Sequence, residues 1–137
     1  MQKIRVGLLT FLCATLAGCG GWNDYGVLIA QVKKTSAKDW HTLAAQLLER
    51  SKTNSTSLPF SEWPRFARDI ARKVPATNWE LSAETNSVSN EPHALLVSLG
   101  GFQCISVDFG SSSFVETEHP QDKVTPIYPG VYVRRNR

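Results

Sequence analysis

Residues 36–51 read SAKDWHTLAAQLLERS and carry the clearest structural signal in the chain. Their apolar side chains recur at i, i+3, i+4, i+7 and i+8, the spacing of one face of an α-helix: Trp40, Leu43, Ala44, Leu47 and Leu48. Ser36 is suited to cap the first turn, and Asp39 three residues later resembles a capping box. The sequence therefore predicts an amphipathic helix over about 37–51, followed by a polar loop at 53–57.

A second amphipathic helix is predicted over 61–74. Ser61 is suited to cap it, Pro64 is tolerated in a first turn, and Pro75 ends it. One face of this helix is apolar: Trp63, Phe66, Ala67, Ile70, Ala71 and Val74. The other face carries a basic stripe: Arg65, Arg68, Arg72 and Lys73. That stripe could meet anionic headgroups or cell-wall polymers, but a solvated helix face explains it.

The pattern becomes extended after residue 78. Residues 79–84 alternate between apolar and polar, 86–92 are rich in turn formers, and 94–99 are almost continuously apolar. A third strand is predicted over 102–109, before Gly110 and the serine turn 111–113. A last short strand is placed either at 114–115 or at 130–133, on the two sides of a segment interrupted by Pro126 and Pro129.

This order of helices followed by strands predicts an α+β fold, with two amphipathic helices packed on one face of a three- to four-stranded antiparallel sheet. We expect these helix residues to be buried against the strands: Trp40, Leu43, Leu47, Phe66 and Ile70. Their expected partners are Leu81, Leu96, Ile105 and Val107. The domain is placed at 36–133, before a solvated basic tail at 134–137. It follows a tether at 19–35, in which residues 27–32 could form a short strand or the start of a helix.

Residues 1–18 have the construction of an export signal. Lys3 and Arg5 form a basic head, and the apolar run that follows reaches about Ala17 without an acidic residue. The run is shorter than the ~20 residues that span a bilayer as a helix. We therefore expect a segment that is removed and not a membrane anchor.

The segment ends in Leu16-Ala17-Gly18-Cys19, which resembles the lipobox of bacterial lipoproteins. The resemblance implies cleavage between Gly18 and Cys19, a diacylglycerol on the Cys19 thiol, and commonly a further acyl chain such as palmitate on the new amine. Two or three acyl chains give firm anchoring to a membrane. Gly20 follows in place of the Asp that retains lipoproteins at the inner membrane, which favours the outer membrane, facing the periplasm, in a cell with two membranes.

A second resemblance covers more of the chain. A Trp63-Pro64 helix, an alternating strand, and then Gly100-Gly101-Phe102 leading into residues 107–110 are similar to small bacterial lipoproteins of uncharacterised function. That group implies no activity.

Charge and cysteine content limit the function classes. Without Lys3 and Arg5, the 15 basic residues fall to 13 against 12 acidic ones, so the net charge of +3 becomes +1. Such a weak positive charge argues against a nucleic-acid partner. With Cys13 removed and Cys19 lipidated, Cys104 has no disulfide partner. Because it lies in an apolar run, we expect Cys104 to be a small buried hydrophobic residue and not a catalytic thiol.

No motif in the chain carries a recognisable chemistry, so we expect no cofactor and no metal. The histidines His41, His93 and His119 lack metal-ligand spacing, and a site built from them could only arise by folding.

The candidate carboxylates are Asp69, Asp108, Glu116, Glu118 and Asp122. Asp108 alternates with apolar neighbours and is expected on the solvent face of a strand. The loop acids Glu116, Glu118 and Asp122 are expected to be hydrated. Ser112 lacks the setting of a nucleophile elbow, and the tryptophans Trp40, Trp63 and Trp79 are expected in the core.

These observations favour a membrane-tethered envelope protein that acts by binding or assembly, with an envelope protein or a cell-wall polymer as partner. The alternative is a small envelope hydrolase or ligand-binding protein whose site is assembled only in the fold. One cleft containing two or more of the following residues would favour that alternative: Asp108, His93, His119, Cys104 and Ser112.

Overall fold

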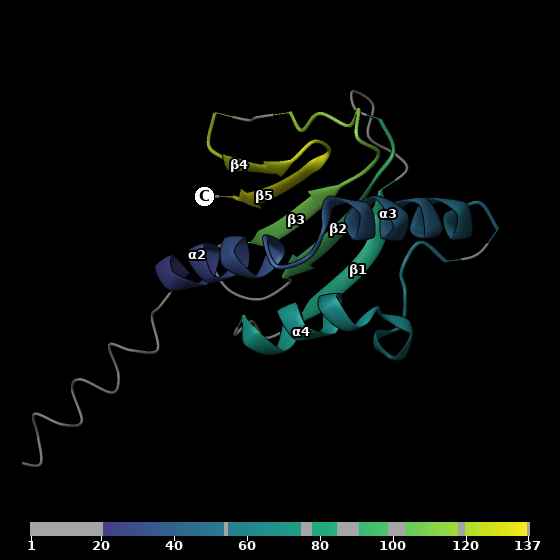
Figure 1. Ribbon diagram of the computed structural model, residues 1–137, viewed down its shortest axis with the longest axis horizontal. Coiled ribbons are helices and arrows are strands. Elements are labelled where there is room, and N and C mark those ends of the chain that lie inside the picture. Colours follow the sequence, from purple (N-terminus) through teal and green to yellow (C-terminus); the bar gives the residue numbers. More distant parts are fainter. Residues whose placement is uncertain are drawn as a thin grey trace, which may run out of the picture.

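The computed structural model describes residues 21–53, 55–74, 78–84, 91–98, 104–117 and 120–136. Within these ranges three α-helices accompany a five-stranded antiparallel sheet (Figure 1). The helices are α2 (Gly21–Val32), α3 (Ala37–Ser51) and α4 (Arg65–Lys73), with a short 3-10 helix, η2 (Phe60–Glu62). The strands are β1 (Trp79–Glu84), β2 (His93–Ser98), β3 (Ile105–Phe109), β4 (Lys123–Tyr128) and β5 (Val131–Arg135), in the order β1-β2-β3-β5-β4. The predicted α+β class is confirmed, with one more helix and a larger sheet than expected.

Helix α3 matches the helix predicted over 37–51. The backbone N–H of Asp39 donates to Ser36 Oγ at 3.2 Å, and Ser36 Oγ donates to Asp39 Oδ2 at 2.8 Å. This reciprocal pair fixes the start of the helix, as the sequence indicated. The helix lies over β1, β2 and β3, with Trp40, Leu43, Ala44 and Leu47 buried.

The second predicted helix is divided in two. Trp63 has an extended backbone, with φ −67° and ψ 142°, and ends the 3-10 turn η2; α4 begins only after Pro64. The ring of a proline disfavours the α conformation in the residue before it, so a helix cannot run smoothly from Ser61 through Pro64. Ser61 is therefore not the N-cap, which is Pro64. The basic stripe on α4 is exposed at Arg65, Arg72 and Lys73.

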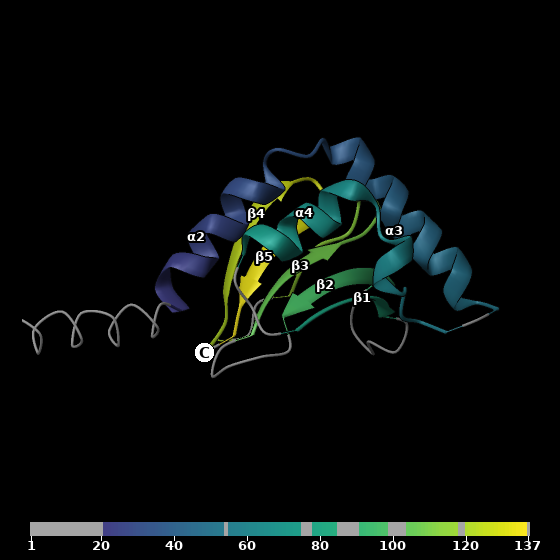
Figure 2. The ribbon, with the colours of Figure 1, turned by 90° about the horizontal axis from the view of Figure 1, so that it is seen from below.

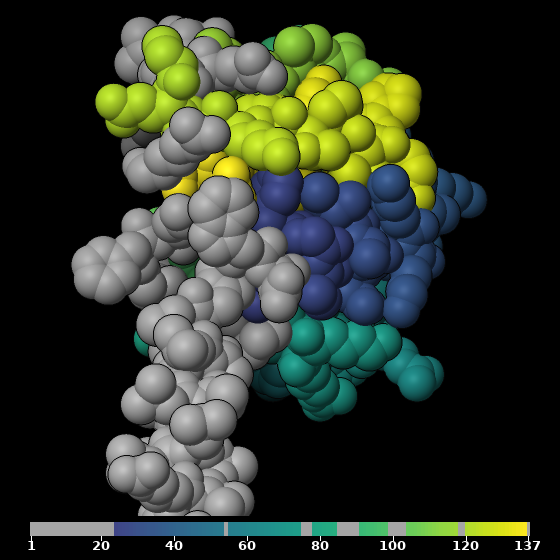
Figure 3. Space-filling view, turned by 90° about the vertical axis from the view of Figure 1, so that its left-hand side faces the viewer, coloured from purple at the N-terminus to yellow at the C-terminus, as the bar shows by residue number. Residues whose placement is uncertain are grey.

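Helix α2 lies within the stretch 19–35, where a tether with a short strand or the start of a helix at 27–32 was expected; the element is a helix, and it begins at Gly21. Tyr25, Leu28 and Val32 lie on one helix face and are buried in the core. The Tyr25 hydroxyl donates to the Val133 carbonyl at 3.1 Å and lies 2.7 Å from Thr125 Oγ1. The helix is seated between the strands β4 and β5 and helix α4 (Figure 3). No helix among the described residues is both long enough and apolar enough to cross a bilayer.

The first three strands agree with the sequence-based prediction. β1 lies at the predicted residues, β2 begins and ends one residue before the predicted range, and β3 lies within the predicted range. Residues 85–90 and 99–103 lie outside the described residues. Of the two places offered for a last strand, residues 114–115 are not a strand and 131–135 are β5. Arg134 and Arg135 therefore belong to a strand and not to a solvated tail. β4 was not predicted, because Pro126 lies inside it.

The core lies between the helices and one face of the sheet (Figure 2). The Trp40 ring is in edge contact with Phe66 and with Phe109, each at a centroid distance of 4.9 Å. The predicted core residues are buried, except Phe66, which is half-buried. Trp40 and Trp63 are buried and Trp79 is half-buried, and each indole N–H donates to a backbone carbonyl. The tryptophans are therefore structural, as expected.

Both edge strands of the sheet, β1 and β4, have a feature that limits pairing with a further strand. Beside β1, the segment around Ser57 adds two backbone hydrogen bonds: Leu58 N–H to the Leu81 carbonyl at 2.9 Å, and Ala83 N–H to the Thr56 carbonyl at 2.8 Å. At the other edge, β4 contains Pro126 and its register with β5 shifts between Pro126 and Tyr128. Proline is tolerated in a sheet chiefly at such an edge.

Candidate functional site

The second face of the sheet, opposite the helices, carries a row of polar side chains. Because side chains alternate along a strand, burial of Val107 and Val133 in the helix-side core turns Ser106 and Asp108 of β3 to the other face. Arg134 of β5 pairs in register with Ser106 and therefore shares that face. These three side chains from two neighbouring strands form the floor of the candidate site.

The segment after β3 folds back over this floor. The Phe114 ring stacks on the His93 ring at a centroid distance of 4.5 Å and meets Tyr132 edge-on at 5.7 Å. The Tyr132 hydroxyl donates to the Phe114 carbonyl at 3.1 Å. Gly110 allows the close return, because a Cβ there would lie 2.8 Å from the Cβ of Phe114. The fold-back carries Glu116 onto the polar floor.

Arg134 is the centre of a charged group that we call the Arg134 cluster: Arg134, Asp108, Glu116 and Asp122. Its Nη1 lies 3.1 Å from Asp108 Oδ2 and 3.4 Å from Glu116 Oε1. Its Nε donates to Asp122 Oδ2 at 3.2 Å. The guanidinium of Arg134 on β5 thus holds one carboxyl group from β3 and two from the connection between β3 and β4.

Burial of this cluster contradicts the sequence-based expectation for its acids. Asp108 is wholly buried at 0 % exposure and accepts a hydrogen bond from Ser106 Oγ at 2.7 Å. Glu116 is 8 % exposed, and its Oε2 has no hydrogen-bond partner. Alternation along β3 correctly placed Asp108 on the face away from the helices. It could not show that residues 110–117 cover that face.

The environment alters the acid–base behaviour of two members of the cluster. Burial, followed by the hydrogen bond and negative charge of Asp108, raises the pKa of Glu116 from 4.5 to about 8, against a smaller opposing effect of Arg134. Burial disfavours the charged form of Arg134, but Asp108 and Glu116 outweigh it, and the pKa of Arg134 is raised. At neutral pH, Glu116 therefore holds a proton while Arg134 stays charged.

His93 joins the cluster from β2. One potential ligand atom from each of His93, Asp108 and Glu116 lies within 4.8 Å of the others, and all three residues are buried. His93 Nδ1 lies 3.2 Å from the Glu91 carbonyl oxygen. Since a carbonyl oxygen only accepts, Nδ1 carries the proton and Nε2 of a neutral ring carries the lone pair. The sequence offered His93 and Asp108 as candidates, and the fold brings them together.

The remaining candidates lie apart from this group or outside the described residues. Cys104 is half-buried just before β3, and not the buried strand residue that we expected. Ser112 is exposed in the turn 111–113, as the turn interpretation requires. The following candidates lie outside the described residues: Gly18, Cys19, Glu118 and His119.

Two candidates on the helices have local partners. His41 Nε2, on α3, lies 2.7 Å from the Pro129 carbonyl. Asp69, on α4, faces Arg65 at 3.9 Å. Neither contact brings these residues to the Arg134 cluster.

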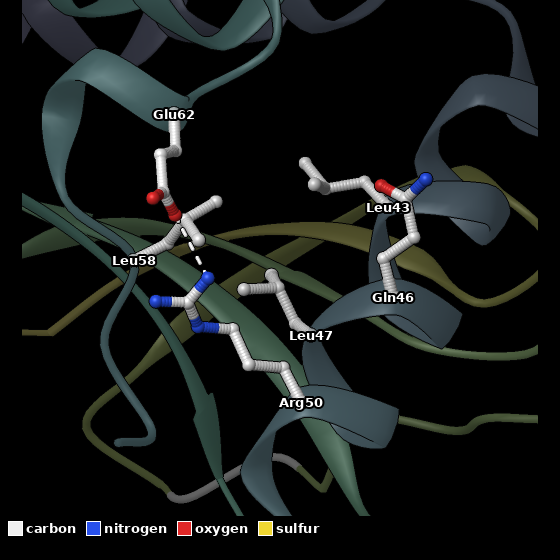
Figure 4. A pocket seen from close by; sticks show the side chains of 6 residues that line it. All are labelled: Leu43, Gln46, Leu47, Arg50, Leu58 and Glu62. Carbon is white, nitrogen blue, oxygen red and sulfur yellow. Dashed lines mark hydrogen bonds and ion pairs between the residues drawn. The ribbon is translucent and has the colours of Figure 1, made fainter. Parts of the chain in front are cut away.

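A separate pocket of about 310 Å³ lies between α3 and the segment that contains η2 (Figure 4). Leu43, Leu47 and Leu58 give it apolar walls, and the ion pair of Arg50 and Glu62 crosses it at 2.8 Å. The ion pair engages only Nη1 of Arg50, whose Nε is buried without a hydrogen-bond partner. The Arg134 cluster is the stronger candidate for chemistry, because it brings a histidine and several carboxyl groups together.

A comparison of the chain with known protein families, curated proteins and solved structures gives no match.

Proposed function

We propose that this chain is a lipid-anchored protein of the cell envelope that binds a partner close to the membrane surface. The observation that carries the proposal is the sequence Leu16-Ala17-Gly18-Cys19, placed at the end of an apolar run with a basic head. A diacylglycerol on Cys19, with or without a further acyl chain, would attach the chain firmly to a bilayer. In a cell with two membranes the chain would reside at the outer membrane and face the periplasm.

The position of α2 adds a geometric element to this proposal. The helix begins at Gly21, and two residues of extended chain span at most about 7 Å. Because Tyr25, Leu28 and Val32 fix the helix in the core, a lipid on Cys19 would hold the whole domain against the bilayer. The partner would then have to lie at the same membrane or in the layer directly beside it.

Mass spectrometry of the protein from its native envelope tests the anchor. We expect residues 1–18 to be absent and an added mass that matches diacylglycerol on Cys19. Cys19→Ser should abolish this mass and release the protein from membranes without detergent, because serine offers a poorer nucleophile than a thiol. Cys104→Ser is the matched control and should remain anchored. An unmodified Cys19, or a Cys19→Ser protein that stays in the membrane fraction, contradicts the proposal.

Cross-linking in intact cells tests the binding role. A partner captured by the wild-type protein should be lost from Cys19→Ser at equal protein level, because the unanchored domain no longer resides at the membrane. Equal capture by both proteins would show that proximity to the membrane plays no part in binding.

A second function is favoured by one structural observation. His93 and Asp108 come together with Glu116 beneath residues 110–117, the kind of convergence that distinguishes a ligand-binding or hydrolytic site from a purely structural domain. This site is independent of the lipid anchor.

A further inference from the structure

We propose that His93, Asp108 and Glu116 bind a divalent transition-metal ion of the Zn²⁺ or Mn²⁺ type. The proposal deepens the second function above and does not depend on lipidation of Cys19. One imidazole nitrogen and two carboxylate oxygens form a ligand set that suits such ions.

The geometry brings three ligand types from three places in the chain to one point. His93 comes from β2, Asp108 from β3 and Glu116 from the segment after β3, and their ligand atoms lie within 4.8 Å of one another. Ligand atoms around a tetrahedral Zn²⁺ ion lie about 3.3–3.6 Å apart, because each lies 2.0–2.2 Å from the metal. An ion therefore needs to draw these groups together by at most about 1.5 Å.

The unpartnered oxygen of Glu116 is the second, independent observation. Glu116 is more than nine-tenths buried and its Oε2 accepts no hydrogen bond. Buried acceptors in native proteins nearly always have a donor, and one without a donor calls for an explanation such as a bound ion. A metal ion at the centre of the three residues supplies the missing positive partner.

His93 is prepared to act as a metal ligand. Its Nδ1–H donates to the Glu91 carbonyl at 3.2 Å, and this leaves the Nε2 lone pair available. Metal-binding histidines commonly make such a bond from the nitrogen that does not face the metal, because it fixes the tautomer and the ring orientation. The Phe114 ring, stacked on His93 at 4.5 Å, further restricts rotation of the imidazole.

Arg134 and Ser106 would orient the carboxylates and leave Oε2 of Glu116 without a partner. Arg134 contacts Asp108 Oδ2 and Glu116 Oε1, and Ser106 donates to Asp108 Oδ1. Once Glu116 gives up its proton to bind the ion, the three carboxylates of the Arg134 cluster and its one guanidinium sum to a charge of −2. A divalent cation balances that charge, as charge pairing of buried ions requires.

A proton shared between Glu116 and Asp108 is the competing explanation for the same geometry. A protonated Glu116 can donate to Asp108 and relieve the repulsion between the two carboxyl groups without any metal. The two explanations differ in whether purified protein takes up one metal ion and in which residues that uptake requires.

The test is calorimetric titration of the full chain, purified in mild detergent and stripped with a chelator, with ZnCl₂ and separately with MnCl₂. We expect one ion per chain, and a loss of affinity of about 100-fold or more in His93→Gln and in Glu116→Gln. His41→Gln and Glu49→Gln are the matched controls and should bind as the wild type does, because neither residue belongs to the cluster. Circular dichroism confirms folding, and Glu116→Gln keeps the test valid if His93→Gln does not fold.

Binding of Co²⁺ adds a spectroscopic signature, since visible absorption bands of the bound ion should be lost in Glu116→Gln and kept in His41→Gln. Absence of stoichiometric binding by the wild-type chain, or binding unaffected by both cluster variants, overturns the metal proposal in favour of the shared proton. Mass spectrometry of the same preparation reports the lipid on Cys19 separately, so failure of either proposal is recognised without the other.

Discussion

Arg134 of β5 and Asp108 of β3 form a diagonal ion pair across two paired strands. The backbone register sets Arg134 opposite Ser106 and Asp108 opposite Tyr132, yet Arg134 Nη1 reaches Asp108 Oδ2 at 3.1 Å. The Asp108 side chain has no exposure to solvent. Arg134 therefore neutralises a buried carboxylate that water cannot reach.

Removal of the Arg134 charge should destabilise the domain strongly. Arg134→Met keeps an apolar stem but leaves Asp108 and its neighbours without their cation, and loss of one partner of a buried pair costs ~3–5 kcal/mol. Urea unfolding followed by circular dichroism measures the change. Arg65→Met is the matched control: Arg65 is 91 % exposed and 3.9 Å from Asp69, so it should cost less than ~0.5 kcal/mol. Equal effects of the two variants would show that the Arg134 cluster is not buried.

Protonation of Glu116 predicts that stability falls with rising pH when no metal is bound. The folded state raises the pKa of Glu116 from 4.5 to about 8. Between these values the folded chain holds a proton that the unfolded chain has released, so stability is greatest near the lower value and is lost toward the upper one. The slope from this group approaches ~1.4 kcal/mol per pH unit.

Glu116→Gln tests this prediction, because glutamine resembles the protonated acid in shape. Urea unfolding with a chelator present, at steps from pH 5 to pH 8, should show a flatter profile for this variant than for the wild type. Glu49→Gln, an exposed change on α3, should keep the wild-type slope. An unchanged slope in Glu116→Gln would exclude Glu116 as the titrating group.

Helix α2 should contribute to stability as a member of the core. Leu28 is fully buried, and Leu28→Ala should lower the free energy of unfolding by ~2–5 kcal/mol, with the loss set by how far the site collapses. The adjacent Ile29 is only half-buried, so Ile29→Ala should cost clearly less. A change below ~1 kcal/mol for Leu28→Ala, measured by urea unfolding, would indicate that α2 is detached from the domain in solution.

Two glycines should respond to alanine in opposite directions. Gly130 has φ +77°, and a Cβ there would lie 1.9 Å from the Ser111 carbonyl oxygen, so Gly130→Ala is expected to disrupt the β4–β5 turn and cost more than ~1 kcal/mol. Gly26 lies within α2 with open space around its Cβ position, so Gly26→Ala should stabilise by ~0.5–1 kcal/mol. Thermal melts of the two variants give the signs directly. A higher melting temperature for Gly130→Ala would contradict the observed turn.

The predictable parts of the fold are those whose signals are local. Helix α3 follows from a period and a cap contained in sixteen consecutive residues, and β1 follows from strict alternation. β4 was missed because Pro126 argues against a central strand, and the sequence could not show that this strand lies at an edge, where proline is tolerated. Helix α2 was left open between a strand and a helix, because its short apolar patch at 27–32 fits both equally well.

The candidate site was only partly predictable, because tertiary structure alone brings Glu116 to His93 and Asp108. Asp108 and His93 were named as candidates, but 14 positions of β-strand and connection separate them and no motif links them. Glu116 looks like an ordinary loop acid in the sequence. Its burial depends on Gly110 and Phe114, which return the chain across the second face of the sheet.

The features of the two sheet edges bear on aggregation by strand addition. Strand addition to an open edge is the first step toward domain swapping and cross-β fibrils. Within the described residues, β1 already bonds the backbone around Ser57, and β4 presents Pro126, which has no N–H, beside a shifted register. Both features make strand addition at these edges less favourable. Copies of the chain at high concentration should therefore show little tendency to join their sheets.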